Sequence, residues 1–329
     1  METRAFGQTA LRSSAIGLGT WPIGGARYGA SDDRDALRAI AAALDAGVTC
    51  FDTAPSYGNG HAEELLGRAL AGRRGDAVIV TKGGLIWDAE SHVLGRDSRR
   101  AAIESHLAGS LRRLATDHVD LYLVHWPDPA VPLEDVMGTL EALVASGRTR
   151  YVGVSNFNGA QLTRSARALR STRLAADQIS LSLFDRRWAL DVLPACEALG
   201  IGIMAYGPLA HGLLTGALTR STVFDEADWR RSGTLFGQAL LTPGNFERNL
   251  DVVDRLAEIA RGEGLTLPQL AIAWVLGQGA VTVALIGART PDEITQAAAA
   301  AGLRLGDQVR ARVDAAMRDA AGLSTVLPT

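Results

Sequence analysis

Four side chains that can hold or move a proton lie at the ends of apolar runs or on the loop just beyond one. Asp52 closes the run VTCF, Tyr57 follows on a glycine-containing loop, Lys82 ends AVIVT and His125 ends LYLV. These residue types perform general acid–base catalysis, and a lysine can also form a Schiff base with a carbonyl compound. A single aspartate, lysine or histidine of this kind is usually a cap, a solvated charge or a core residue. Because all four fall at equivalent places, we expect them to share one site.

Eight short apolar segments alternate with helical patterns and form the scaffold that must position these side chains. The strands are expected at residues 15–21, 48–53, 77–83, 119–126, 151–157, 176–180, 202–208 and 282–288. Helical periodicity separates them; Ile103, Leu107, Leu111 and Leu114, for example, recur on one face. Parallel strands joined by helical crossovers close into a barrel without free edges. The predicted fold is therefore α/β, a (β/α)8 TIM barrel, with residues 1–329 as a single domain.

Two segments lie outside this repeat. Residues 3–12 are expected to form an N-terminal β-hairpin that plugs the bottom of the barrel. Residues 209–246 form a long polar stretch after the seventh strand, and loops of that length in a compact domain are usually functional. We interpret this stretch as a lid over the C-terminal face, where such barrels build their active sites. The loops at 22–32 and 84–97 would shape the pocket together with it.

Composition and charge narrow the functional classes. The chain carries 33 Lys and Arg against 36 Asp and Glu, a net charge of −3, without a block of like charges, so no nucleic-acid or membrane partner is indicated. The two cysteines, Cys50 and Cys196, lie far apart, which fits a cytoplasmic location. No metal site is expected, since the histidines lack ligand spacing. A P-loop, a GxSxG elbow and a Rossmann glycine motif are also missing.

Several motifs, in their order and spacing, resemble the aldo-keto reductase superfamily. They are DTAPSYGNGHAEELLG, VIVTKGG, SLRRLATDHVDLYLVHWPD, GRTRYVGVSNF, AYGPLAHGLLTG and IGARTPDE. The branch of bacterial myo-inositol-catabolism and general-stress reductases looks most similar. The resemblance covers nearly the whole chain and implies an NADP(H)-dependent oxidoreductase that reduces aldehydes or ketones to alcohols by hydride transfer. The catalytic tetrad that it implies falls on Asp52, Tyr57, Lys82 and His125.

The chemistry of carbonyl reduction explains why these residue types would be needed. Hydride addition to carbon requires a proton on oxygen, and the resemblance makes Tyr57 the general acid. A free phenol has a pKa of about 10, and we expect the Lys82 ammonium to lower it. Asp52 would keep Lys82 protonated and aimed. His125 would hydrogen-bond the substrate oxygen and stabilise the charge that develops there.

The resemblance also implies a set of residues that bind the cofactor. Ser155, Asn156 and Gln178 would hydrogen-bond the nicotinamide carboxamide, and Tyr206 would stack on its ring. The full expected set is Gly19, Thr20, Trp21, Ser155, Asn156, Gln178, Tyr206, Gly207, Pro208, Leu209, Gly212, Leu214, Arg230, Gly287, Arg289 and Glu293.

The phosphate end of the cofactor is expected near residues 287–290, just before a helix. Backbone N–H groups there suit phosphate, and the Arg289 guanidinium suits a 2′-phosphate. Glu293 stands where the family branch often carries glutamine or arginine, and its carboxylate could repel that phosphate. NADP(H) is therefore the expected cofactor, with NAD(H) as the alternative.

Trp21, Trp87 and Trp126 each follow a strand end and are expected to line the substrate pocket. Aromatic walls favour apolar or planar carbonyl compounds, and indole N–H groups can also bind sugar hydroxyls. Three alternatives stay open: the same fold acting as a sugar or alcohol dehydrogenase, a Schiff-base aldolase using Lys82, or a nucleotide-sensing protein like the potassium-channel β-subunits. The expected partner is a small carbonyl or sugar substrate; the sequence leaves the oligomeric state open.

Overall fold

Eight parallel strands close into a barrel in the computed structural model, which describes residues 1–25 and 31–327. In order around the barrel they are β10 (Leu174–Ser180), β11 (Gly202–Tyr206), β12 (Val281–Gly287), β3 (Ile16–Gly19), β4 (Cys50–Asp52), β5 (Val78–Gly83), β8 (Val119–Val124) and β9 (Thr149–Ser155). Each expected strand overlaps one of these, with ends that differ by at most two residues. The predicted (β/α)8 fold is confirmed.

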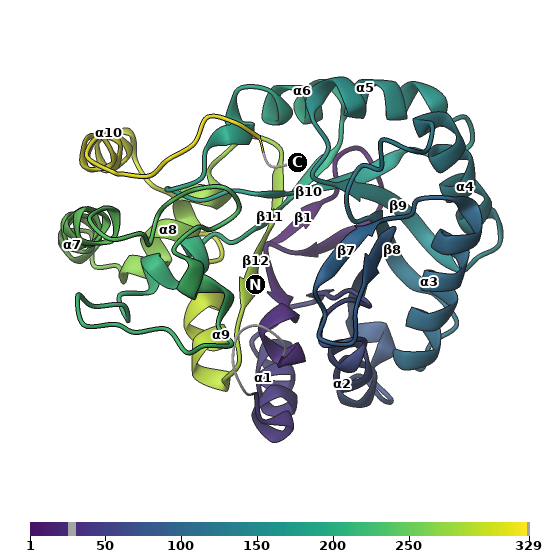
Figure 1. The fold of residues 1–329 in the computed structure, drawn as a ribbon, viewed down its shortest axis with the longest axis horizontal. Helices are drawn as coiled ribbons and strands as arrows, with labels where there is room; N and C mark the ends of the chain where they lie inside the picture. The colour runs from purple at the N-terminus through teal and green to yellow at the C-terminus, as the bar shows by residue number, and fades with distance from the viewer. Residues whose placement is uncertain (26–30, 328–329) are drawn as a thin grey trace.

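Helices cover the outside of the barrel (Figure 1). They are α1 (Asp33–Asp45), α2 (His61–Ala69), α3 (Arg100–Arg113), α4 (Leu133–Ala145), α5 (Gly159–Ala168), α6 (Val192–Leu199), α7 (Asn245–Gly262), α8 (Leu267–Leu276), α9 (Pro291–Ala298) and α10 (Asp307–Met317). α7 and α10 pack against each other on one flank. No helix within the described ranges is long and apolar enough to cross a membrane.

The amphipathic pattern of the sequence explains how these helices attach to the barrel. α1 begins where the Asp32 carboxylate accepts a hydrogen bond from the Arg34 backbone N–H at 2.7 Å. Ala36, Ile40 and Ala43 then recur on one face and are buried against the barrel. The apolar stripe thus fixes which side of the helix faces the strands.

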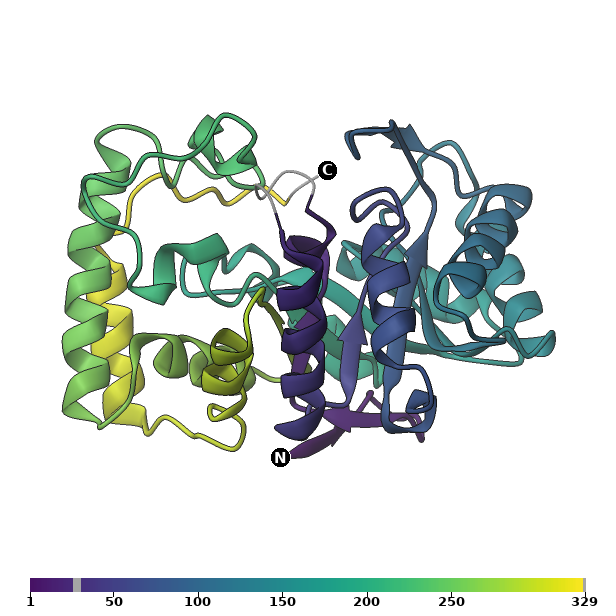
Figure 2. The ribbon, with the colours of Figure 1, turned by 90° about the horizontal axis from the view of Figure 1, so that it is seen from below.

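The N-terminal hairpin, β1 (Thr3–Ala5) paired with β2 (Arg12–Ser14), lies at the end of the barrel opposite the long loops (Figure 2). Phe6 at its turn is fully buried among interior strand side chains that include Leu121 and Met204. Gly7 approaches the Gly200 carbonyl oxygen so closely that a Cβ atom on it would lie 2.0 Å away. The hairpin therefore closes the bottom of the barrel, as the sequence predicts.

The segments at the other end form the mouth (Figure 2). A two-stranded hairpin, β6 (Leu85–Trp87) with β7 (Val93–Arg96), follows β5. After β11, residues 207–244 contain the short helices η4 (Ala210–Thr215) and η5 (Trp229–Ser232), and we call this segment the lid. The C-terminal tail holds the lid, since the Ala239 backbone N–H donates to the Gly322 carbonyl oxygen at 2.9 Å. Of the expected loop at 22–32, residues 26–30 lie outside the described part of the chain.

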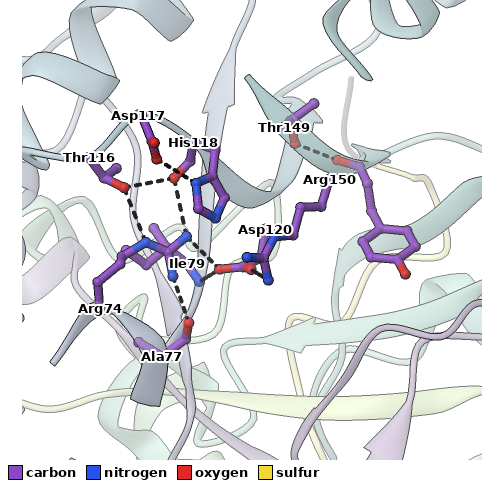
Figure 3. A network of polar contacts seen from close by, with 10 residues as sticks. Arg74, Ala77, Ile79, Thr116, Asp117, His118, Asp120, Thr149 and Arg150 are labelled. Carbon is purple, nitrogen blue, oxygen red and sulfur yellow. Dashed lines mark hydrogen bonds and ion pairs between the residues drawn. The ribbon is translucent and has the colours of Figure 1, made fainter. Parts of the chain in front are cut away.

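A polar network ties three strands together at the bottom of the barrel (Figure 3). Asp120, near the start of β8, is buried and accepts hydrogen bonds from the Ile79 backbone N–H at 2.9 Å and from Arg74 Nη2 at 2.8 Å. Arg150 on β9 donates to its other oxygen at 3.1 Å. Arg74 also donates to the Ala77 carbonyl oxygen at 2.9 Å. One carboxylate therefore joins β5, β8 and β9 far from the mouth.

Replacing Asp120 by alanine is expected to lower the free energy of unfolding by about 2 to 3 kcal/mol, because a buried backbone N–H and two guanidinium groups lose their acceptor. Urea unfolding measures the change. Asp117→Ala is the matched control, since the Asp117 side chain is 93% exposed and its loss should matter little. Equal unfolding midpoints for the two variants would show that the network does not hold the strands together.

Asp177 lies on β10 and is fully buried between the barrel and its helices. Neither of its carboxylate oxygens has a hydrogen-bond partner among the described residues. Burial raises the pKa of this carboxyl well above its usual value, and the nearby Phe157 backbone amide offsets the rise only in part. An unpaired buried carboxylate is very costly, so Asp177 is a neutral acid in the folded protein.

This acid should make stability depend on pH. Because the folded-state pKa is raised, the contribution of Asp177 is complete below the unfolded-state pKa of about 4 and is lost as pH rises toward the folded-state pKa. Asparagine does not ionise, so Asp177→Asn removes this pH-dependent loss. The free energy of unfolding of the variant should exceed that of the unaltered protein at pH 8 and by much less at pH 5. Urea unfolding at both pH values tests this; the same difference at both would contradict it.

Candidate active site

A fully buried lysine at the mouth of the barrel organises the site. Lys82 Nζ donates to both carboxylate oxygens of Asp52 at 2.8 Å and to the Thr53 carbonyl oxygen at 3.0 Å. It also donates to Tyr57 Oη at 3.1 Å. Gln178 Nε2 donates to Asp52 Oδ1 at 2.7 Å. Three of the four predicted catalytic side chains are therefore in direct contact.

Strand register and one tight loop bring these groups together. Asp52 ends β4 opposite Val80, so Lys82 lies just beyond it on the neighbouring strand. The Tyr57 backbone N–H donates to the Ala54 carbonyl oxygen at 3.0 Å, which turns the loop back over the strand ends. Gly58 has φ +60° and lies against the backbone of Gly24, where a Cβ atom would be 2.1 Å from the carbonyl oxygen. The loop thus needs glycine to place the phenol.

Burial dominates the protonation of these groups. Desolvation lowers the pKa of Lys82 and raises that of Asp52, while their mutual attraction opposes both shifts. Burial also raises the pKa of Tyr57 well above its usual value, and the Asp52 carboxylate adds to the rise. The expectation that Lys82 lowers this pKa is therefore wrong for the structure. The main reason is desolvation of the buried phenol, and the Asp52 carboxylate raises the pKa further.

His125 follows β8 and faces the phenol. Its backbone N–H donates to the Gly83 carbonyl oxygen at 2.9 Å, and its ring meets the Tyr57 ring edge-on, with centroids 6.1 Å apart. Burial lowers the pKa of His125 well below its usual value, and the positive charge of Lys82 lowers it further. The imidazole is therefore neutral and can donate one N–H to an oxygen beside Tyr57.

A hydrogen-bonded layer next to the tetrad contains the residues predicted to hold the nicotinamide. Tyr206 Oη donates to Asn156 Oδ1 at 2.9 Å, and Asn156 Nδ2 donates to Ser155 Oγ at 3.0 Å. Ser155 Oγ donates to the Gln178 carbonyl oxygen at 2.8 Å. Asn156 has φ 63°, a left-handed conformation that asparagine tolerates. These bonds fix the side chains in one layer at the cavity floor.

A cavity of about 530 Å³ opens over these groups. From the tetrad, Asp52, Tyr57 and His125 line it, while Lys82 lies beneath them. The predicted cofactor and substrate residues that line it are Gly19, Trp21, Trp126, Ser155, Asn156, Gln178, Tyr206, Gly207, Pro208, Leu209, Gly212, Arg230, Gly287, Arg289 and Glu293.

Three predicted residues are not brought to this cavity. Thr20 and Leu214 are fully buried in the surrounding packing. Trp87 lies on the β6–β7 hairpin, where its Nε1 donates to Asn59 Oδ1 at 3.0 Å. The sequence analysis placed Trp87 after the end of a barrel strand. In the structure Trp87 belongs to the separate β6–β7 hairpin, so its side chain does not point into the cavity.

An aromatic roof over the cavity contains residues that the sequence analysis did not single out. Trp21 stacks on Tyr57 and on Trp229 from the lid, with ring centroids 6.1 and 5.5 Å apart. Phe236 packs against both Trp229 and Tyr206. His211 lies against Phe236, and burial lowers its pKa to about 4. Trp21 therefore covers the phenol, and the lid packs Trp229 and Phe236 against Trp21.

The expected phosphate end of the cavity is partly occupied by the chain itself. The Glu293 carboxylate accepts from the Arg289 backbone N–H at 2.7 Å and from the Thr290 backbone N–H at 3.3 Å. Thr290 Oγ1 accepts in turn from the Glu293 backbone N–H, which completes a capping box at the start of α9. Arg230 on the lid is bound to Asp228 at 2.6 Å. A negative charge thus lies at the helix N-terminus where phosphate was expected.

Comparison with known proteins agrees with this geometry. Residues 15–318 match the model of the aldo/keto reductase family. Aldo-keto reductase YhdN of Bacillus subtilis is 38% identical over 89% of this chain and 87% of its own length. NADH-specific methylglyoxal reductase of Escherichia coli is 30% identical over 93% and 95%. The structure of glycerol dehydrogenase AKR11B4 from Gluconobacter oxydans has a TM-score of 0.86 at 38% identity and covers 99% of this chain and 97% of its own. The chain therefore belongs to the aldo/keto reductase family and is an oxidoreductase of carbonyl or alcohol groups.

Proposed function

We propose that this enzyme reduces aldehydes or ketones to alcohols with a nicotinamide cofactor, NADP(H) first and NAD(H) as the alternative, and that Tyr57 is the general acid. The observation that carries the proposal is the Lys82 ammonium, which is fully buried and hydrogen-bonded to both Asp52 and Tyr57 beneath a cavity of about 530 Å³. The hydrogen-bonded layer of Ser155, Asn156 and Tyr206 beside the phenol fits a nicotinamide ring and its carboxamide.

The residues of this chain divide the proton chemistry between them. The nicotinamide supplies the hydride when it is bound. Tyr57 Oη carries the proton, since burial keeps the phenol neutral, and transfers it to the substrate oxygen. The neutral His125 donates a hydrogen bond to the same oxygen. Lys82 Nζ already donates to Tyr57 Oη and so stabilises the phenolate as it forms. The raised pKa of Tyr57 supports reduction as the favoured direction, because oxidation needs the phenolate.

The alternatives find less support in the geometry. A Schiff-base aldolase needs a lysine amine that a substrate can reach, but Lys82 is fully buried and donates to Asp52, Thr53 and Tyr57. A channel-subunit role draws on one relative, a probable voltage-gated potassium channel subunit beta of Oryza sativa that is 32% identical. A site with every predicted proton-transfer group in place favours catalysis instead. The name of the glycerol dehydrogenase relative favours alcohol oxidation as the second candidate.

Tyr57→Phe tests the assigned acid. The substitution should lower kcat for a reactive aldehyde by about 10²- to 10⁴-fold, because it removes the proton donor. The affinity for NADPH, followed by quenching of tryptophan fluorescence, should change by no more than about a factor of two to three. Near-normal turnover would make the assigned acid wrong, and lost cofactor binding would show instead that the phenol supports the nicotinamide site.

The choice between NADPH and NADH should respond to the two charges at the start of α9. Glu293→Gln keeps the capping geometry but removes the negative charge, so NADPH should bind about tenfold more tightly while NADH changes little. Arg289→Gln should weaken NADPH binding by a similar factor. Fluorescence titration of each variant with both nucleotides measures this. Equal effects on NADPH and NADH would mean that neither residue meets the 2′-phosphate.

A further inference from the structure

An arginine in the cavity wall forms no ion pair with any acid in residues 1–25 and 31–327. Arg96 ends β7 and lines the cavity. The adjacent Asp97 is instead paired with Arg99 at 2.6 Å. At the tip of the same hairpin, the Asp88 carboxylate accepts from the backbone N–H groups of residues 90 and 92 and contacts the His92 ring at 3.0 Å. Arg96 is thus left without an ion-pair partner among the described residues.

Two contacts hold the Arg96 guanidinium in place. Nη1 donates to the Pro127 carbonyl oxygen at 2.8 Å, and the guanidinium lies over the Trp126 ring at 5.2 Å from its centroid. The Nε–Nη2 edge donates to no group within the described ranges. That edge presents two parallel N–H bonds, the arrangement that matches the two oxygens of a carboxylate.

The position of Arg96 connects it to the substrate end of the cavity and not to the phosphate end. Trp126 and Pro127, which hold the guanidinium, directly follow His125. Arg289 and Glu293 instead follow β12, which is separated from β5 by β3 and β4 around the barrel. In Figure 2 the hairpin and the lid accordingly lie on different sides of the mouth. The neighbouring wall residues Leu85 and Val93 are apolar and offer the guanidinium no polar partner.

We propose that Arg96 is an anion subsite and that the preferred substrates are aldehydes or ketones that also carry a carboxylate. The guanidinium binds that carboxylate through its Nε–Nη2 edge while the carbonyl group lies between Tyr57 and His125. This inference rests on the proposed carbonyl reduction and names its substrate class. It adds a specificity that aromatic walls alone do not supply, because a neutral aldehyde of equal shape leaves the cation unpaired.

Two aldehydes of nearly equal shape but different charge test the subsite, and comparing the variant with the unaltered protein on each aldehyde cancels their difference in reactivity. 4-Carboxybenzaldehyde carries the anion, and 4-nitrobenzaldehyde is its neutral counterpart. Arg96→Met should lower kcat/KM for the carboxylate by about 10- to 100-fold, mainly through KM, with little change for the nitro compound. Arg99→Met is the matched control, because Arg99 is exposed and does not line the cavity. Equal losses on both aldehydes would make Arg96 a structural clamp of Trp126 and Pro127 and overturn the proposal.

A binding measurement separates this inference from the proposed reaction. Calorimetry should detect benzoate binding to the protein, with loss in Arg96→Met, partial retention in Arg96→Lys and no dependence on Arg96 for benzamide. If benzoate binds in this way but no aldehyde is reduced, the proposed reaction fails and the anion subsite stands. If neutral aldehydes are reduced while benzoate does not bind to the unaltered protein, the reaction stands and the subsite is wrong. The unaltered protein decides this even if Arg96→Met does not fold.

Discussion

The site depends on a single buried ion pair between Lys82 and Asp52. Moving an ammonium or a carboxylate out of water costs several kcal/mol each, and the attraction between them repays this only when other hydrogen bonds complete the geometry. Here Asp52 binds Lys82 through both oxygens, while Thr53, Tyr57 and Gln178 satisfy the remaining contacts. The strand register of β4 and β5 is what makes this arrangement available. A shift of the register would leave a buried charge without a partner.

The pairing also sets the chemistry of the phenol. Desolvation keeps the proton on Tyr57 before reaction, and the Asp52 carboxylate that binds Lys82 raises the pKa of the phenol further. Trp21 stacks on the phenol, and Trp229 and Phe236 of the lid pack against Trp21. A protonated tyrosine beside a neutral histidine suits donation to a carbonyl oxygen. The buried site thus favours a neutral Tyr57 phenol and a neutral His125 imidazole.

The barrel and the position of the tetrad could be predicted from the sequence. Barrel strands are visible as apolar runs, and the residues at their C-terminal ends must meet at one face. The contacts of the lid could not, since Trp229 and Phe236 reach Trp21 across most of the chain length. Trp87 was expected in the pocket, but its hairpin turns it toward Asn59. The sequence analysis predicted a lowered pKa for Tyr57, whereas the structure gives a raised one. The sequence indicates which charged residues share the site but not how deeply the phenol is buried.

The most direct test of the central claim is the ionisation of Tyr57 itself, followed by NMR of protein labelled with ¹³C at the ζ carbon of tyrosine and assigned with Tyr57→Phe. The account predicts that the Tyr57 resonance keeps its neutral-phenol shift past pH 10, the usual value of about 10 for tyrosine. It further predicts that Asp52→Asn moves the ionisation to lower pH, because the substitution removes the carboxylate that raises the pKa of Tyr57. A phenolate signal for Tyr57 below pH 9 in the unaltered protein would contradict the account.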